Sequence, residues 1–255
     1  MKGKNFLPIT AHEVKERGWA EVDFVYVCGD AYVDHPSFGA AIITRVLEAQ
    51  GFNVAFLAQP KFNNCEDFKR FGKPRLGFLV SAGNIDSMVA HYSVAKRKRN
   101  YDYYSPGGKI GFRPDRACEV YSRLIKEAYP DSPVILGGLE ASLRRFAHYD
   151  YWEDKVLESL LISSGADLLT YGMGESIIKK IAALLDKGVP INKIRDVRGT
   201  VWVGSRSDKI HFEAAGNWDF EKLRDDKKYY ASAFAVQYKN QDSAYGKALV
   251  EYYGE

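Results

Sequence analysis

The first residues with chemical potential are Asp30, Asp34 and His35, in the segment GDAYVDHPSFG. A carboxylate beside an imidazole can act as an acid/base pair or bind a metal ion. The alternative is structural, because Asp30 and Asp34 could cap a helix that begins at Pro36. We favour capping, since aspartate is common in turns and at the starts of helices.

Three further turns, SAGNIDS, GGLEASLRR and GMGE, combine glycine with charged or amide side chains. They contribute the candidate cleft residues Asn84, Asp86, Gly137, Gly138, Glu140, Arg144, Arg145, Gly172 and Glu175. Glycine lets the backbone turn sharply and approach a ligand closely. Glycine recurs with a polar group in every one of these turns, and this recurrence is stronger evidence for a site than any single residue.

Two of these turns allow alternative interpretations. Glu140, Arg144 and His148 lie four residues apart, which predicts one helical face forming either a polar wall of a site or a solvated row of ion pairs. Gly172 and Gly174 match only part of a dinucleotide-binding fingerprint, and they follow the fifth predicted strand instead of the first. We therefore do not expect a nicotinamide or flavin there.

The elements that position these turns are short apolar segments alternating with helical patterns. The predicted strands are residues 23–29, 53–58, 75–81, 133–136, 166–171 and 199–204. The predicted helices are residues 36–50, 65–71, 84–92, 114–129, 141–161 (interrupted near HYDYW) and 175–186. This alternation predicts a doubly wound α/β fold with a mostly parallel sheet. Ligands bind such sheets beyond the carboxyl ends of the strands, where the polar turns lie.

The pattern weakens after Ile210. We expect residues 1–210 to form the α/β domain and residues 211–255 to form a helical extension or linker, because 218–255 reads as one or two polar helices rich in tyrosine. This last region looks like one that ought to continue into a further domain.

Composition narrows the class of protein. The chain has 255 residues, a formal net charge of +3 and three cysteines, Cys28, Cys65 and Cys118. The charge is too small to demand a nucleic-acid partner. Residues 96–99 (KRKR) could contact RNA, but a solvated loop is favoured. No secretory signal or long apolar run occurs, so we expect a cytoplasmic protein with buried structural thiols and no membrane partner.

A resemblance to a known family extends this interpretation. The segments GDAYVDHPSFGAAI, SAGNIDSM, RPDRACEVYSRLIKEAYPDSPVILGGLEASLRRFAHYDYW and YGMGE resemble the YgiQ-type radical SAM family, over residues 6–255. The resemblance implies that family's N-terminal region, a Rossmann-like fold akin to cobalamin-binding domains. In the family this region precedes a radical SAM barrel, whose Cys-x-x-x-Cys-x-x-Cys motif binds a 4Fe-4S cluster and S-adenosylmethionine.

The chain departs from the family's catalytic pattern because its three cysteines do not match that motif. We therefore expect no cluster, no S-adenosylmethionine site and no catalytic residue in this chain. Cobalamin is also not expected. The Asp-x-His-x-x-Gly motif of related domains is out of register here, since Asp34 and His35 are adjacent and His35 lies four residues before Gly39.

Three hypotheses follow. The favoured one is an accessory domain that shapes or covers the active site of the radical SAM barrel, its partner in the full-length family. The second is an independent binding module for cobalamin, a nucleotide or RNA. The third is a purely structural domain.

Overall fold

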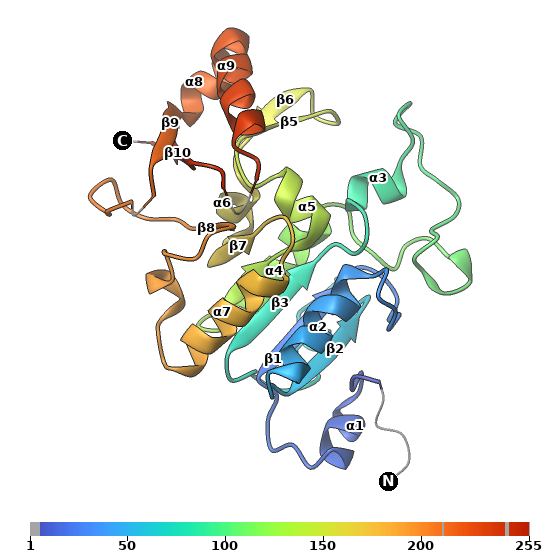
Figure 1. Cartoon of the computed structure of the whole chain (residues 1–255). Coiled ribbons are helices and arrows are strands. Elements are labelled where there is room, and N and C mark those ends of the chain that lie inside the picture. Colours follow the sequence, from blue (N-terminus) through green and yellow to red (C-terminus); the bar gives the residue numbers. More distant parts are fainter. Residues whose placement is uncertain (1–5, 211, 243–244, 255) are drawn as a thin grey trace.

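The computed structural model describes residues 6–210, 212–242 and 245–254. Its main sheet has six strands in the order β2-β1-β3-β4-β7-β8 (Figure 1). The strands span Phe24–Cys28 (β1), Val54–Ala58 (β2), Gly77–Ser81 (β3), Val134–Leu136 (β4), Leu168–Thr170 (β7) and Thr200–Val201 (β8). The first five strands of this order are parallel, and β8 runs antiparallel to β7. The predicted doubly wound, mostly parallel α/β fold is confirmed.

Helices cover both faces of the sheet because successive strand residues point to opposite sides. Val25 and Val27 belong to one core, with α4 (Ala117–Ala128) and α6 (Leu160–Ser164). Phe24 and Tyr26 belong to the other, with α2 (Gly39–Ala49) and α7 (Glu175–Asp186). Strands buried on both faces read as unbroken apolar runs, which explains why the sequence predicted them well.

Short helices complete this part of the fold. They are α1 (Ala11–Glu16), α3 (Ser87–His91), α5 (Gly138–Leu143) and the 3-10 turns η1 (Glu66–Lys69), η2 (Pro106–Gly108) and η3 (Ile191–Lys193). The sequence analysis missed α1, although Thr10 and Glu13 form a capping box at its start.

Two predicted helices need correction. The first begins at Gly39, not Pro36, and neither Asp30 nor Asp34 caps it. Asp34 instead accepts a hydrogen bond from Arg45 Nε at 3.2 Å.

The second correction concerns the helix predicted over residues 141–161. It is replaced after Leu143 by a hairpin of β5 (His148–Asp150) and β6 (Lys155–Leu157), followed by α6. The Asp150 carboxylate makes the turn by accepting hydrogen bonds from the backbone N–H groups of Trp152 and Glu153. His148 therefore lies on a strand and not on a helical face with Glu140 and Arg144.

Residues 212–242 and 245–254 form a second, smaller layer beside the β5–β6 hairpin, at the top of Figure 1. It contains β9 (Ala214–Asp219), α8 (Phe220–Asp225), α9 (Lys227–Lys239) and β10 (Ala248–Tyr252), and we call it the C-terminal layer. The predicted polar helices are present, but two strands, β9 and β10, were missed, and they pair in parallel. None of the helices in the described ranges is long and apolar enough to cross a membrane.

Candidate functional site

A cleft of about 290 Å³ lies at the carboxyl edge of the main sheet, and we call it the edge cleft. The strand order reverses between β1 and β3, which is the point where open α/β sheets bind ligands. Six predicted site residues line this cleft: Asp30, Asn84, Gly137, Gly138, Gly172 and Glu175. Apolar side chains form much of the remaining wall, among them Val33, Phe38, Ile43, Leu139 and Met173.

Glycine is required at two positions beside the edge cleft. Gly83 has a φ of +115°, and a Cβ there would lie 2.0 Å from Oδ1 of Asp30. Gly138 has a φ of +81°, and its Cβ would lie 3.3 Å from the Ser81 side chain. Residues with a side chain rarely adopt such backbone angles. The two turns therefore come close to β1 and β3 only because they carry glycine.

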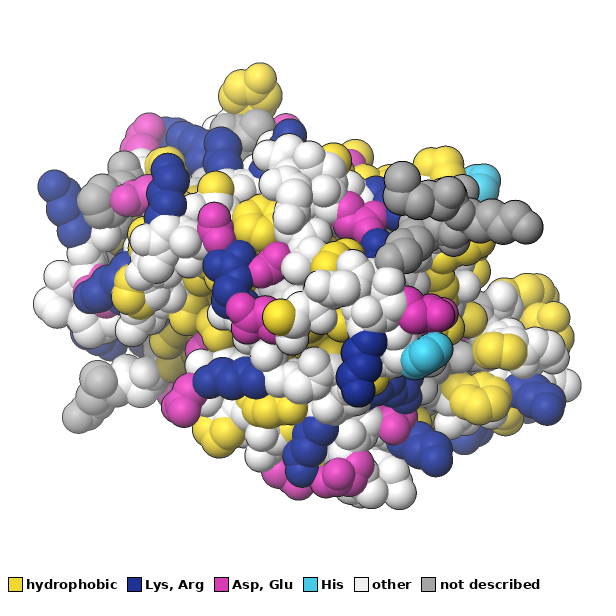
Figure 2. All heavy atoms as spheres, turned by 90° about the horizontal axis from the view of Figure 1, so that it is seen from below, with side chains coloured by type: hydrophobic (Ala, Val, Ile, Leu, Met, Phe, Trp, Pro, Cys, Tyr) yellow, Lys and Arg dark blue, Asp and Glu magenta, His cyan; other side chains and the backbone are white. Residues whose placement is uncertain are grey.

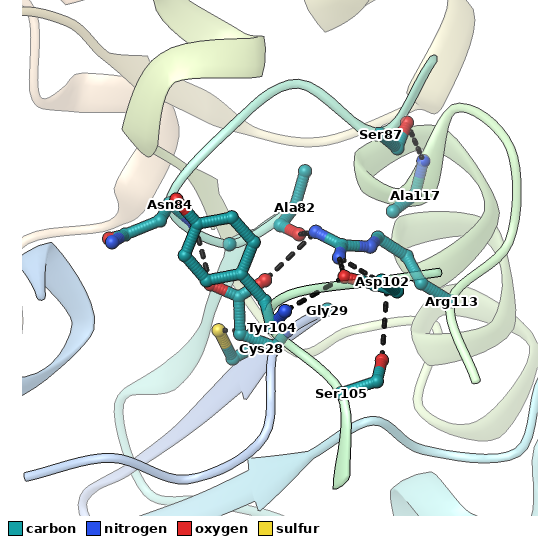
Figure 3. Close-up of polar contacts among 12 residues, drawn as sticks. Cys28, Gly29, Ala82, Asn84, Ser87, Asp102, Tyr104, Ser105, Arg113 and Ala117 are labelled. Atoms are coloured by element: carbon teal, nitrogen blue, oxygen red, sulfur yellow. Dashed lines mark hydrogen bonds and ion pairs between the residues drawn. The ribbon is translucent and has the colours of Figure 1, made fainter. Parts of the chain in front are cut away.

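A buried ion triad centred on Arg113 lies beside the cleft (Figure 3). Arg113 Nη1 donates to Asp30 Oδ1 at 2.8 Å and to the Ala82 carbonyl at 3.0 Å. Its Nη2 donates to both carboxylate oxygens of Asp102, at 3.0 and 2.8 Å. The exposed fractions of the three side chains are 0% for Arg113 and 3% for each aspartate. The triad ties β1 and β3 to the long loop before α4.

Burial and the charge of Arg113 have opposite effects on the pKa values of the two aspartates in this triad. Burial raises the pKa of Asp30 to about 6, against the attraction of Arg113. Burial also acts on Asp102, but the hydrogen bonds from Arg113 and from the backbone of Tyr104 hold its pKa below the ordinary value. Asp30 Oδ2 also accepts a hydrogen bond from the Asn84 N–H at 2.7 Å. Because both Asp30 oxygens are engaged, this carboxylate orders the floor of the cleft and is not placed as a free general base.

A second buried polar cluster contains Asp86, Glu140 and Arg144. Arg144 Nη1 lies 2.5 Å from Asp86 Oδ2 and 3.5 Å from Glu140 Oε2. Glu140 also accepts hydrogen bonds from Ser87 N and Oγ and from Cys118 N. This cluster joins α3, α4 and α5 behind the cleft and does not line it.

The remaining predicted residues lie elsewhere. Asp34 pairs with Arg45, and the exposed His35 accepts a hydrogen bond from Ser37 N at 3.2 Å. Arg145 points toward a different cavity. The structure thus separates the predicted set into a cleft, a buried cluster and isolated residues.

The three cysteines do not suit a cluster-binding role. Cys28, Cys65 and Cys118 are all buried free thiols on different elements. Burial raises the pKa of Cys28 to about 12 and that of Cys118 well above its usual value, whereas cluster ligands are thiolates. Within residues 6–210, 212–242 and 245–254, no three His, Cys, Asp or Glu side chains form a metal-binding group. These residues therefore do not fit a 4Fe-4S cluster, and we derive no step through one.

The basic segment 96–99 partly serves the fold. Lys96 donates to the Trp152 carbonyl, and Arg99 donates to the carbonyls of Val89 and Tyr92. On the face seen from below in Figure 2, basic and acidic side chains are interspersed. This pattern gives no specific support to RNA binding.

The sequence analysis missed the centre of the triad, Arg113 and Asp102. Arg113 is separated from Asp30 by 83 positions, and Asp102 lies in the long loop before α4, outside every predicted strand and helix. The only available signal was that Arg113 begins the segment RPDRACEV, on which the family resemblance rests.

Comparison with known proteins places these features in a family. The model described as "Radical SAM N-terminal" matches residues 6–255. A UPF0313 protein of Clostridium botulinum (strain Loch Maree / Type A3) is 54% identical over 259 residues, which cover 100% of this chain and 39% of that relative. A UPF0313 protein of Clostridium perfringens (strain 13 / Type A) is 50% identical over 251 residues, covering 98% and 38%. The chain thus spans about two fifths of these relatives, and it belongs to the radical SAM N-terminal family.

Proposed function

We propose that this chain is an accessory domain whose carboxyl edge docks on the radical SAM catalytic domain of the full-length protein and covers its active site. Relatives extend well beyond the matched region, since the chain corresponds to only 39% of their length. The family name implies that a 4Fe-4S cluster and S-adenosylmethionine serve the full-length protein. In this proposal those groups are held by the catalytic domain and not by the residues described here.

The observation that carries the proposal is the apolar rim around the edge cleft. Three large apolar side chains that line this cleft are exposed: Val33 by 39%, Leu139 by 45% and Met173 by 76%. They come from three separate places in the chain: Val33 follows β1, Leu139 lies on α5 after β4, and Met173 follows β7. Apolar side chains gathered at one concave edge are typical of a surface that meets a partner. Isolated exposed apolar residues would need no such explanation.

The chemistry of the edge also favours a cover over an independent enzyme. Asp30 is occupied by Arg113 and Asn84, and Glu140 is occupied by Ser87, Cys118 and Arg144. A polar floor within an apolar rim can contact a substrate and exclude water. A radical reaction benefits from such exclusion because water and solvent can quench reactive intermediates.

The test uses the full-length protein with a photo-crosslinking amino acid at position 173. We expect light to link this position to peptides beyond residue 255. The matched control has the same amino acid at position 6, because Phe6 is 67% exposed and does not line the edge cleft. If position 173 links only to residues within 6–254, or if position 6 links to the catalytic domain equally well, the docking edge is wrongly assigned.

A second arm tests the cover itself. Leu139→Asp with Met173→Asp should increase oxygen bleaching of the cluster in the reconstituted full-length protein, while Phe6→Asp should leave the bleaching rate unchanged. An unchanged bleaching rate in the double variant would contradict the covering role even if the crosslink forms. Arg144 and Arg145 are unsuitable for this test because Arg144 pairs with buried Asp86 and Arg145 lines another cavity.

A further inference from the structure

A larger cavity, of about 580 Å³, lies between the β7–β8 edge of the main sheet and the C-terminal layer. We call it the seam cavity. Its walls come from the end of β7, from β8 and the loop after it, and from β10, which lie near one another in Figure 1. Five cationic side chains line it: Arg145, Arg195, Arg198, Arg206 and Lys247. The edge cleft does not share these residues, so the seam cavity is a separate site.

Three of the arginines are held in a similar way, each by at least one aromatic ring and by one backbone carbonyl. The guanidinium carbons lie 4.8, 4.6 and 4.4 Å from the ring centroids in the pairs Arg145–Tyr171, Arg198–Phe212 and Arg206–Tyr252. The same arginines donate to the carbonyls of Ser142, Gly246 and Gly254, respectively. Rings and carbonyls orient a guanidinium without neutralising its charge, and each guanidinium has five N–H donors. A guanidinium held in this way can still donate hydrogen bonds to a further acceptor.

The acidic groups of the seam cavity are already engaged. Asp208 pairs with Arg195 at 2.7 Å and accepts a hydrogen bond from Ser205 N. Glu251 accepts hydrogen bonds from Ala147 N and Tyr253 Oη.

Among the described residues, the ion pairs found for the cations of this cavity are Arg195–Asp208 and Lys247–Glu213. Five cationic side chains and two carboxylates, Asp208 and Glu251, line this concave, aromatic-rich space, and Asp242 adds a negative charge near Tyr171, so positive charge is still in excess among the described residues. Burial lowers the pKa of the half-buried Arg145, as expected for a guanidinium held away from water without a carboxylate partner.

We propose that the seam cavity binds a phosphate ester of nucleotide size. Arginine matches phosphate because its planar fork donates two parallel hydrogen bonds to two oxygens. The volume falls within the roughly 300–1,000 Å³ of typical small-molecule sites. The apolar part of such a ligand would contact walls that include Leu161, Val197, Val201 and Trp202. This inference is independent of the docking edge proposed above.

The test measures binding of AMP, ATP, inorganic phosphate and malate to the 255-residue chain by calorimetry and by tryptophan fluorescence. We expect the nucleotides to bind and to change the fluorescence of Trp202, with phosphate and malate binding at least about tenfold more weakly. Arg198→Gln with Arg206→Gln should weaken nucleotide binding by about tenfold or more, since both residues are exposed at the rim and their loss leaves the fold intact. The matched control is Arg123→Gln, an exposed arginine on α4 that should leave Kd unchanged.

Two results would overturn the proposal. One is that neither nucleotide binds the wild-type chain. The other is that nucleotide affinity is the same in the double rim variant, with circular dichroism showing that the variant is folded. Malate binding as tightly as the nucleotides would also refute the ligand class, because it would mean that the cavity selects charge without selecting phosphate.

Discussion

Replacing Arg113 with methionine tests the ion triad most directly. The change keeps much of the apolar volume of the side chain but removes four hydrogen bonds, to Asp30, the Ala82 carbonyl and both oxygens of Asp102. Two carboxylates, each 3% exposed, would then remain buried without a cation. Removing one partner of a buried ion pair costs about 3–5 kcal/mol of unfolding free energy. For a chain of this size the melting temperature should fall by roughly 6–20 °C.

The loss should depend on pH. The pKa of Asp30 is raised to about 6 from the ordinary 3.8, so its ionised form is disfavoured in the folded state. When folding raises the pKa of a carboxyl group, the folded state is less stable at every pH above the folded-state pKa. This loss of stability disappears as the pH falls from the folded-state pKa to the unfolded-state pKa. Without Arg113 the folded-state pKa should rise further, because the attraction that lowers it is gone. The variant should therefore lose more unfolding free energy at about pH 8 than at about pH 5.

The assay is urea denaturation of the chain followed by circular dichroism at both pH values. Arg123→Met is the matched control, because Arg123 is exposed on α4 and its replacement should cost less than about 0.5 kcal/mol. Adding Asp30→Asn and Asp102→Asn to Arg113→Met should restore part of the loss by removing the buried charges. A loss below about 1 kcal/mol, or an equal loss at both pH values, would refute the reasoning from burial.

Two further predictions concern the turns and the thiols. Gly83→Ala should lower the unfolding free energy by about 2–5 kcal/mol, because it combines left-handed backbone strain with a Cβ placed 2.0 Å from Asp30. Gly18→Ala, with a φ of +72° and open space around its Cβ, should lose only about 1–2 kcal/mol, so equal urea midpoints would contradict this account. A thiol reagent at about pH 8 should label none of Cys28, Cys65 and Cys118 within minutes in the native chain and all three in urea, because all three side chains are buried. Rapid labelling of the native chain would contradict this expectation.

The sequence predicted the central strands closely because β1, β2 and β3 are buried on both faces and therefore read as continuous apolar runs. It also predicted α7 from Glu175 to Asp186, where apolar residues recur at helical spacing. The strands β9 and β10 show no continuous apolar run in the sequence. Their residues are mostly half-buried, and neither strand contains a fully buried position.

The candidate site was predictable only in part. The rule that ligands bind beyond the carboxyl ends of parallel strands predicted that Asp30, Asn84 and Glu175 lie close together, and all three line the edge cleft. It could not reveal that Asp30 is already paired, because Arg113 comes 83 positions later. Nor could it separate Glu140, whose buried hydrogen bonds to Ser87 and Cys118 depend on how three helices pack.

The construction of the C-terminal layer has a consequence for local unfolding. A two-stranded sheet is marginal by itself, and α9 buries no residue fully. The layer is tied to residues 147–159 by side chains such as Tyr230, Glu251 and Tyr253, which accept hydrogen bonds from backbone N–H groups. Such a unit opens sub-globally, at a lower free energy than the main sheet. The seam cavity exists only while the C-terminal layer is closed, so a ligand bound in the cavity would stabilise the closed layer by mass action. The resistance of the layer to proteases would therefore increase with ligand concentration.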